Sequence, residues 1–292
     1  MTGWKLGIIG GSGLHDLERL TDIHETAVET PWGKPSAPLR SGVLNGTPIV
    51  FIPRHGHGHT IPPNAINYRA NIDALKRVGV TDIVSLSACG SLQEAYAPGD
   101  FVVVDQYIDR TRNRASSFFG PGCVAHVPFA DPVCSRLAAL VGDAAELASA
   151  PTHRGGTYLA MQGPQFSSRA ESRLYRSWGC DVIGMTNMPE AKLAREAELP
   201  YASVAMVTDF DSWRETGDAV DVAAILSVME ANASKARGLV DHLATRLATL
   251  PRTPSPDGIE TILDAAIVTP RDSRDRVLTS RLRTIAGRVL GE

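Results

Sequence analysis

The chain has 292 residues, a formal net charge of −3, and apolar and charged fractions of 43% and 21%. These values are typical of a folded protein of one or two domains, and they exclude disordered and collagen-like classes. The sequence has no long run of lysine and arginine that would favour a nucleic acid or membrane partner, and no apolar run of the ~20 residues that a membrane span needs.

Short β-branched segments alternate with longer segments of helical periodicity, which predicts an α/β fold. In chain order, strands are expected at residues 5–9, 48–52, 81–86, 101–105, 158–162, 182–185 and 201–208. Helices are expected at residues 67–78, 168–178, 189–198 and 222–247. Prolines at 251, 254 and 256 break the last helix and predict a stiff linker, so the main domain is expected to span residues 1–250.

The remaining segment, residues 251–292, holds the linker and two short helical patterns at 259–267 and 274–290. It has few large apolar residues and is therefore not expected to fold alone. We expect this tail to pack on the main body or on a neighbouring subunit.

The four cysteines are scattered without C-x-x-C spacing, and no secretory signal opens the chain. We expect buried, reduced thiols in a cytoplasmic protein. They are Cys89, Cys123, Cys134 and Cys180.

Polar clusters follow several predicted strands, at the sheet edge where α/β proteins bind ligands. Gly10-Gly11-Ser12-Gly13 offers backbone N–H groups and a hydroxyl, although a structural turn is an equal alternative. It is neither a Walker A loop nor a dinucleotide fingerprint, because Asp16 stands where the third glycine would be. Arg54 with His55, and Ser87 with Ala88, add further donors. Together these groups predict an oxyanion site.

Histidines at positions 55, 57 and 59 alternate along one segment, so a metal site is an alternative interpretation. No acidic residue or cysteine stands near them, and glycines separate them. The pattern therefore favours phosphate binding or a structural role, and no metal is expected.

Asp209 and Asp211 stand two residues apart just after an apolar strand. Paired carboxylates at this spacing can bind a metal, act as general acid and base, or accept hydrogen bonds from an amino group; an Asp-rich turn is the structural alternative. Phe166, in Gly163-Pro164-Gln165-Phe166, is available to stack on a flat heterocycle, unless it is a core side chain.

These motifs stand in the order of a known family. They are Gly7-Ile8-Ile9-Gly10-Gly11-Ser12-Gly13, Pro53-Arg54-His55-Gly56, Asn67-Tyr68-Arg69-Ala70-Asn71, Ala88-Cys89-Gly90-Ser91-Leu92, Gly163-Pro164-Gln165-Phe166-Ser167-Ser168-Arg169-Ala170-Glu171, Met185-Thr186 with Pro189-Glu190, and Thr208-Asp209-Phe210-Asp211. Over about residues 4–248 the chain resembles the 5′-methylthioadenosine phosphorylases, in the trimeric branch of the purine nucleoside phosphorylases. The resemblance implies a single-domain fold with a central mixed sheet flanked by helices and a C-terminal helical tail.

The resemblance also implies roles for individual residues. Asp209 would meet N7 of the purine and Asp211 its 6-amino group, as the catalytic pair. Met185 would lie under the ribose, and Phe166 would pack on the purine with Ser167 nearby. Val222 and Ile225 would form an apolar pocket for the 5′ substituent, closed by His126 and the tail, around Val268, of a neighbouring subunit. The phosphate would be held by Ser12, Arg54, His55, Ser87, Ala88 and Thr186.

The implied activity is that of a pentosyltransferase in purine and methionine salvage. It would cleave 5′-methylthioadenosine with phosphate to adenine and 5-methylthioribose 1-phosphate, as a cytoplasmic homotrimer without cofactor. Alternatives are a 5′-deoxy or 5′-halo adenosine or adenosine itself as substrate, a non-catalytic nucleoside-binding regulator, and a dinucleotide-dependent dehydrogenase that the broken glycine fingerprint disfavours. The chain departs from relatives at Ser12 and Ser87, often threonine, and at Gly184, an asparagine in some members.

Overall fold

A mixed sheet of eleven strands forms the middle layer of the part of the chain that the computed structural model describes, residues 3–11, 19–214 and 222–291, with the backbone alone at 222–225. Its strands are β1 (Leu6–Gly10), β2 (Thr21–Thr26), β3 (Leu39–Leu44), β4 (Thr47–Pro53), β5 (Asp82–Ser91), β6 (Phe101–Val104), β7 (Gln106–Asp109), β8 (Thr152–Arg154), β9 (Thr157–Ala160), β10 (Val182–Gly184) and β11 (Tyr201–Asp209). The α-helices are α1 (Tyr68–Arg77), α2 (Ser135–Leu147), α3 (Arg169–Ser177), α4 (Asn187–Glu196), α5 (Val222–Thr249), α6 (Arg276–Arg281) and α7 (Arg283–Leu290). Short 3-10 helices are η1 (His57–His59), η2 (Pro63–Ala65), η3 (Asp211–Trp213), η4 (Ile259–Ala265) and η5 (Arg271–Ser273).

The strand β5 is the centre of the sheet. Strands β4, β1, β5 and β11 run parallel, with β1 and β11 on either side of β5. Towards its end β5 pairs with the antiparallel β10, where Val182 lies opposite Ser91. The C-terminal ends of the four parallel strands therefore meet at one edge, which is where the predicted polar clusters stand.

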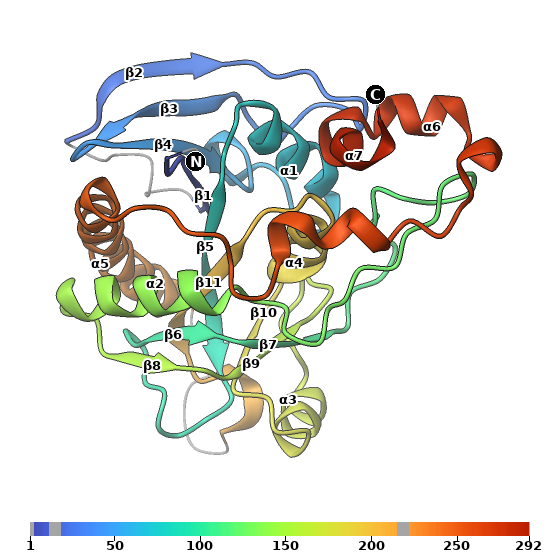
Figure 1. Cartoon of the computed structure of the whole chain (residues 1–292). Helices are drawn as coiled ribbons and strands as arrows, with labels where there is room; N and C mark the ends of the chain where they lie inside the picture. Colours follow the sequence, from blue (N-terminus) through green and yellow to red (C-terminus); the bar gives the residue numbers. More distant parts are fainter. Residues whose placement is uncertain (1–2, 12–18, 215–221, 292) are drawn as a thin grey trace.

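Helices cover both faces of the sheet (Figure 1). Side chains of α1, α4 and α7 pack into one apolar cluster, and those of α2 and α5 into a second. Strands in the middle are buried on both sides: all five residues of β1 and eight of the nine in β11 are buried. This three-layer arrangement confirms the expected α/β fold with a central mixed sheet flanked by helices.

Several predicted boundaries change in the structure. The strand predicted at 81–86 continues to Ser91, and the helix predicted at 189–198 spans Asn187–Glu196. The helical pattern at 259–267 forms a 3-10 helix, and that at 274–290 is divided into α6 and α7 at Leu282.

Sequence reasoning missed α2 and four strands, β2, β3, β7 and β8. The N-cap residue before α2 is Cys134, whose side chain makes no capping hydrogen bond, so the helix lacks a polar start signal. All six residues of β2 are exposed, so no alternation of apolar and polar residues marks it as a strand.

The C-terminal tail packs on the main body of the same chain. Ile285 and Leu290 of α7 join the apolar cluster next to α1. Arg252, in the linker, forms a 2.6 Å ion pair with the fully buried side chain of Asp82 at the start of β5. No described helix is long and apolar enough to cross a membrane.

Candidate active site

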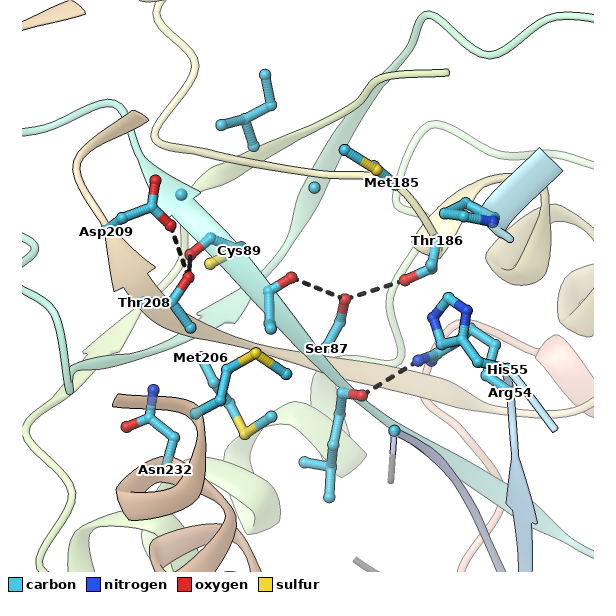
Figure 2. Close-up of a pocket in the computed structure, with 18 of the residues that line it drawn as sticks. Arg54, His55, Ser87, Cys89, Met185, Thr186, Met206, Thr208, Asp209 and Asn232 are labelled. Atoms are coloured by element: carbon cyan, nitrogen blue, oxygen red, sulfur yellow. Dashed lines mark hydrogen bonds between the residues drawn. The ribbon is translucent and has the colours of Figure 1, made fainter. Parts of the chain in front are cut away.

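A cavity of about 250 Å³ lies at the edge where β5, β10 and β11 end. It brings together nine residues predicted from the sequence, although they come from widely separated segments. In Figure 2, Asp209 lies on one side of this cavity, and Arg54, His55 and Thr186 lie on the other. The predicted residues in its lining are Arg54, His55, Ser87, Ala88, Phe166, Met185, Thr186, Asp209 and Asp211.

Other predicted residues do not line the cavity or cannot be placed in it. Ser12 lies outside the described residues, as do the side chains of Val222 and Ile225, whose backbone forms the first turns of α5. Ser167 lies behind the cavity, where it contacts Asp211. His126 is exposed and away from the lining, and its backbone N–H donates to the carbonyl of Ala266 in the tail.

Arg54 follows β4 and is held by a buried carboxylate. Its Nε and Nη2 donate to the two oxygens of Glu190 at 2.8 and 3.0 Å, and both side chains are 2% exposed. Nη2 also donates to the hydroxyl of Ser85, and Nη1 donates to the carbonyl of Leu86. Burial opposes the guanidinium charge, but Glu190 outweighs it and the pKa of Arg54 is raised. The site therefore holds a fixed, permanently charged arginine whose direction Glu190 sets.

His55 stands beside Arg54 and is neutral. Its Nδ1 lies 2.9 Å from the carbonyl oxygen of Ile61, and a carbonyl only accepts, so Nδ1 carries the proton. Burial and the positive charge of Arg54 lower the pKa of His55 to about 4. In this tautomer Nε2 is an acceptor, suited to the hydroxyl of a monoprotonated phosphate. The ring stacks on His59 at 4.0 Å, but no described group of three or more His, Cys, Asp and Glu side chains is arranged to bind a metal.

Two hydroxyls complete the anion-binding side. Ser87 in β5 and Thr186 after β10 are each 5% exposed, and their oxygens are 3.0 Å apart. One of these two hydroxyls donates a hydrogen bond to the other. An anion that accepts hydrogen bonds from both hydroxyls would therefore replace the bond between them.

Asp209 ends β11 and is half-buried. Its two oxygens contact the hydroxyl of Thr208 at 2.6 Å and the backbone N–H of Asp211 at 3.0 Å. Burial raises the pKa of Asp209, and the charge of Asp211 adds to the rise, while the hydrogen bond from Thr208 opposes it. A raised pKa makes this carboxyl more suitable as a proton donor near neutral pH.

Asp211 is held in an uncommon backbone conformation, with φ of 24°. Both of its oxygens lie within 2.7 Å of the hydroxyl of Ser167. A methyl group on Gly90 would stand 3.2 Å from Oδ2 of Asp209 and from Cβ of Asp211, so the glycine leaves space for both acids. Strain of this kind persists where surrounding contacts hold it, often at functional sites.

The ligand-facing apolar surface comes from Phe166 and a wall of methionines. Phe166 is 52% exposed and lines the cavity, so the alternative that it is a core side chain is wrong. Met161, Met185, Met206 and Met229 also line the cavity. A polar cavity end beside an apolar one suits a ligand with an anionic part and a flat, weakly polar part.

Two residues important to the site were missed as functional residues. Glu190 belongs to the Pro189-Glu190 motif, but no role was predicted for it. A buried arginine needs a carboxylate partner, so Arg54 is the signal that points to such an acid. Thr208, just before Asp209, places its hydroxyl between that acid and the carbonyl of Cys89. All four cysteines are buried, as expected, and Cys89 lines the cavity.

Comparison with known proteins identifies the family. Residues 5–245 match the model of the phosphorylase superfamily. The chain is 58% identical to an S-methyl-5′-thioadenosine phosphorylase of Cereibacter sphaeroides over 98% of both chains, and 56% identical to one of Bradyrhizobium diazoefficiens over 99% of both.

Solved structures agree with these sequence matches. A methylthioadenosine phosphorylase from an Antarctic soil metagenomic library has a TM-score of 0.91 at 44% identity, covering 98% of this chain and 99% of that one. A mutant adenosine/methylthioadenosine phosphorylase of Schistosoma mansoni in complex with methylthioadenosine has a TM-score of 0.83 at 36% identity, covering 94% and 99%. The chain belongs to the phosphorylase superfamily, in the family of the S-methyl-5′-thioadenosine phosphorylases.

Proposed function

We propose that the protein cleaves 5′-methylthioadenosine with inorganic phosphate, giving adenine and 5-methylthioribose 1-phosphate. The observation that carries this proposal is one cavity with hydroxyls and a buried arginine on one side and a carboxyl of raised pKa on the other. The names of its relatives support the same reaction.

The phosphate side is assigned to Ser12, Arg54, His55, Ser87, Ala88 and Thr186. Bound phosphate has two roles in this reaction: one of its oxygens forms the new bond to C1′, and its negative charge stabilises the positive charge that develops on the sugar. The fixed guanidinium of Arg54 and the hydroxyls of Ser87 and Thr186 suit that anion. Neutral His55 would accept a hydrogen bond from the hydroxyl of monoprotonated phosphate at Nε2, which would fix the orientation of the anion for attack on C1′.

The base side is assigned to Asp209 and Asp211. As the C1′–N9 bond breaks, its electron pair moves to the purine. Asp209 would stabilise that negative charge by donating a proton, or a hydrogen bond, to N7. Asp211, oriented by Ser167, would accept from the 6-amino group, and Phe166 would pack on the ring. A 6-oxo group would turn a lone pair toward the same carboxylate and cost about 1–3 kcal/mol, which favours adenine over hypoxanthine.

The ribose and its 5′ substituent would lie on the methionine wall, with Met185 under the sugar. Val222 and Ile225 of α5 would extend this wall toward the 5′ group. His126 and Val268 would close the pocket of a neighbouring subunit in a homotrimer. In the described chain the segment that contains His126 lies next to the segment that contains Val268, because the N–H of Val268 donates to the carbonyl of Val124 at 2.9 Å. Val268 is 56% exposed, as a residue that contacts another subunit would be in the isolated chain.

This proposal includes the division into a phosphorylase domain, residues 1–250, and a linker with a helical tail, residues 251–292. It also includes a cytoplasmic location, a role in purine and methionine salvage, and phosphate as co-substrate with no cofactor. A 5′-deoxy or 5′-halo adenosine remains the nearest alternative substrate, because one methylene in an apolar pocket is worth only about 1–3 kcal/mol.

One assay tests the reaction and the substrate together. Release of adenine is measured with and without phosphate, using methylthioadenosine, adenosine, a 5′-halogenated adenosine and inosine (for which hypoxanthine is measured). We expect phosphate-dependent cleavage with the highest kcat/KM on methylthioadenosine. Cleavage at equal rates without phosphate would contradict phosphorolysis, and comparable rates on inosine would contradict the role of Asp211. The homotrimer is tested by light scattering.

A further inference from the structure

A buried tyrosine that the proposed mechanism does not use lies directly behind Gly184 in the cavity wall. Tyr158, in β9, is completely buried, and its hydroxyl has no hydrogen-bond partner within the described residues. A buried hydroxyl without a partner costs about 1–3 kcal/mol. Such a cost suggests that the hydroxyl gains a partner in another state of the protein, such as the state with ligand bound.

The position of this hydroxyl is defined by Gly184 at the end of β10. A methyl group built on Gly184 would lie 1.9 Å from the hydroxyl oxygen of Tyr158 and 2.6 Å from its Cζ. The tip of Tyr158 therefore fills the volume that a side chain at position 184 would need. Gly184 lines the cavity immediately before Met185 and Thr186, so this glycine leaves room for the phenol directly behind the cavity wall.

The neighbours of the phenol belong to the anion-binding side. Burial raises the pKa of Tyr158 to about 12, and weak hydrogen-bonding contacts with the hydroxyl of Ser87 and the backbone of Thr186 oppose that rise, so the phenol lies near both groups without a hydrogen bond of full geometry to either. The phenol is therefore neutral at pH 7 and is a hydrogen-bond donor. It lies behind Ser87, whose oxygen is 3.0 Å from that of Thr186 on the cavity side.

Binding of an anion changes the bonds of Ser87. Without the anion, the hydroxyls of Ser87 and Thr186 bond to each other. The hydroxyl of Ser87 also lies 3.3 Å from the carbonyl of Ala88, and when it donates there it accepts from Thr186. When both hydroxyls turn to donate to phosphate, the oxygen of Ser87 loses that donor and has an unused lone pair. The phenol of Tyr158 is the buried donor available to it.

We propose that Tyr158 is a positioning residue of the phosphate site, which donates to the oxygen of Ser87 while Ser87 donates to bound phosphate. This inference rests on the proposed function, since it assigns Ser87 to phosphate. The chain of hydrogen bonds runs from the phenol to the serine and on to the anion, and each bond polarises the next. Gly184 and Tyr158 act as a pair, because a larger residue at 184 would displace the phenol.

The test compares Tyr158→Phe with Tyr107→Phe. Tyr107, in β7, is a matched control: its ring packs edge-on against Tyr158 with centroids 5.8 Å apart, and its hydroxyl is also buried without a partner among the described residues. The hydroxyl of Tyr107 is near Ser203 and Asn187 rather than Ser87 and Thr186, so it is not next to the proposed phosphate groups. Both substitutions remove one buried hydroxyl from neighbouring rings, so effects on packing should match.

In Tyr158→Phe we expect KM for phosphate to rise about fivefold or more, with KM for methylthioadenosine at saturating phosphate changed less than about twofold. The rise in Tm that inorganic phosphate gives the wild-type protein should shrink in Tyr158→Phe and persist in Tyr107→Phe. An active Tyr158→Phe with the wild-type KM for phosphate overturns the inference. A wild-type protein without phosphorolysis would contradict the proposed function instead.

Discussion

Glu190→Gln removes the carboxylate that neutralises the buried guanidinium of Arg54. Both side chains are 2% exposed, and the two hydrogen bonds between them measure 2.8 and 3.0 Å. Glutamine keeps the shape and one acceptor oxygen, which can still accept from the hydroxyls of Ser85 and Tyr201. Its amide nitrogen, however, turns donors toward a guanidinium that also only donates.

The magnitude follows from burial. Breaking a buried ion pair by removing one partner costs about 3–5 kcal/mol, because the other charge is left without compensation. In a chain of this size that cost corresponds to a fall in Tm of roughly 10 °C. Glu146→Gln is the control, since Glu146 pairs with Arg154 at the same 2.8 Å but the side chains are 54% and 41% exposed. An exposed pair contributes only about 0–1 kcal/mol.

The assay is thermal unfolding of the wild type and both variants, each with and without inorganic phosphate. Phosphate beside Arg54 would return a negative charge to the guanidinium, so it should raise the Tm of Glu190→Gln by more than that of the wild type. A Tm of Glu190→Gln within about 2 °C of Glu146→Gln would refute the energetic reasoning. Equal phosphate shifts in all three proteins would refute the contact between Arg54 and phosphate.

Three further predictions follow from the site. Asp209→Asn should lower kcat by about 10²–10³ and leave phosphate affinity nearly unchanged, and equal turnover would exclude the general-acid role. Gly90→Ala should raise KM for the nucleoside about tenfold, because the added methyl group would displace both carboxylates. Gly120→Ala is the control, since no atom lies within 4 Å of the added methyl group, and it should leave KM unchanged. Equal KM values for the two variants would contradict this role of Gly90. The pKa of His55 is about 4 in the fold against an ordinary 6.5, so the unfolded chain binds the proton first and stability falls as pH drops through this range. Between about pH 6.5 and pH 4 the wild-type protein should therefore lose on the order of 3 kcal/mol of its free energy of unfolding because of His55, and His55→Gln should not show this loss. If the free energy of unfolding of His55→Gln falls with pH as steeply as that of the wild type, the assignment of the low pKa to His55 is contradicted.

The sequence by itself determined most of the frame of this site. Periodicity and turn residues placed β1, β4, β5 and β11, and a shared sheet edge follows once parallel strands end together. The polar residues at that edge could be recognised from the sequence, because Arg54, Ser87 and Asp209 each come just after a strand predicted from the sequence. The spacing of these residues left their individual roles open, and the resemblance of the ordered motifs to a known family supplied those roles.

Tertiary structure alone decided which buried groups face each other. Arg54 meets Glu190 across 136 residues of chain, and Ser167 meets Asp211 across 44. Local pattern carries the period of a helix or strand but not the long-range register that brings two buried polar groups within 3 Å. The same limit hid Tyr158, which looks like an ordinary strand tyrosine in the sequence. Only the pairing of β9 with β10 brings its hydroxyl into the space left by the missing side chain of Gly184, behind the cavity wall.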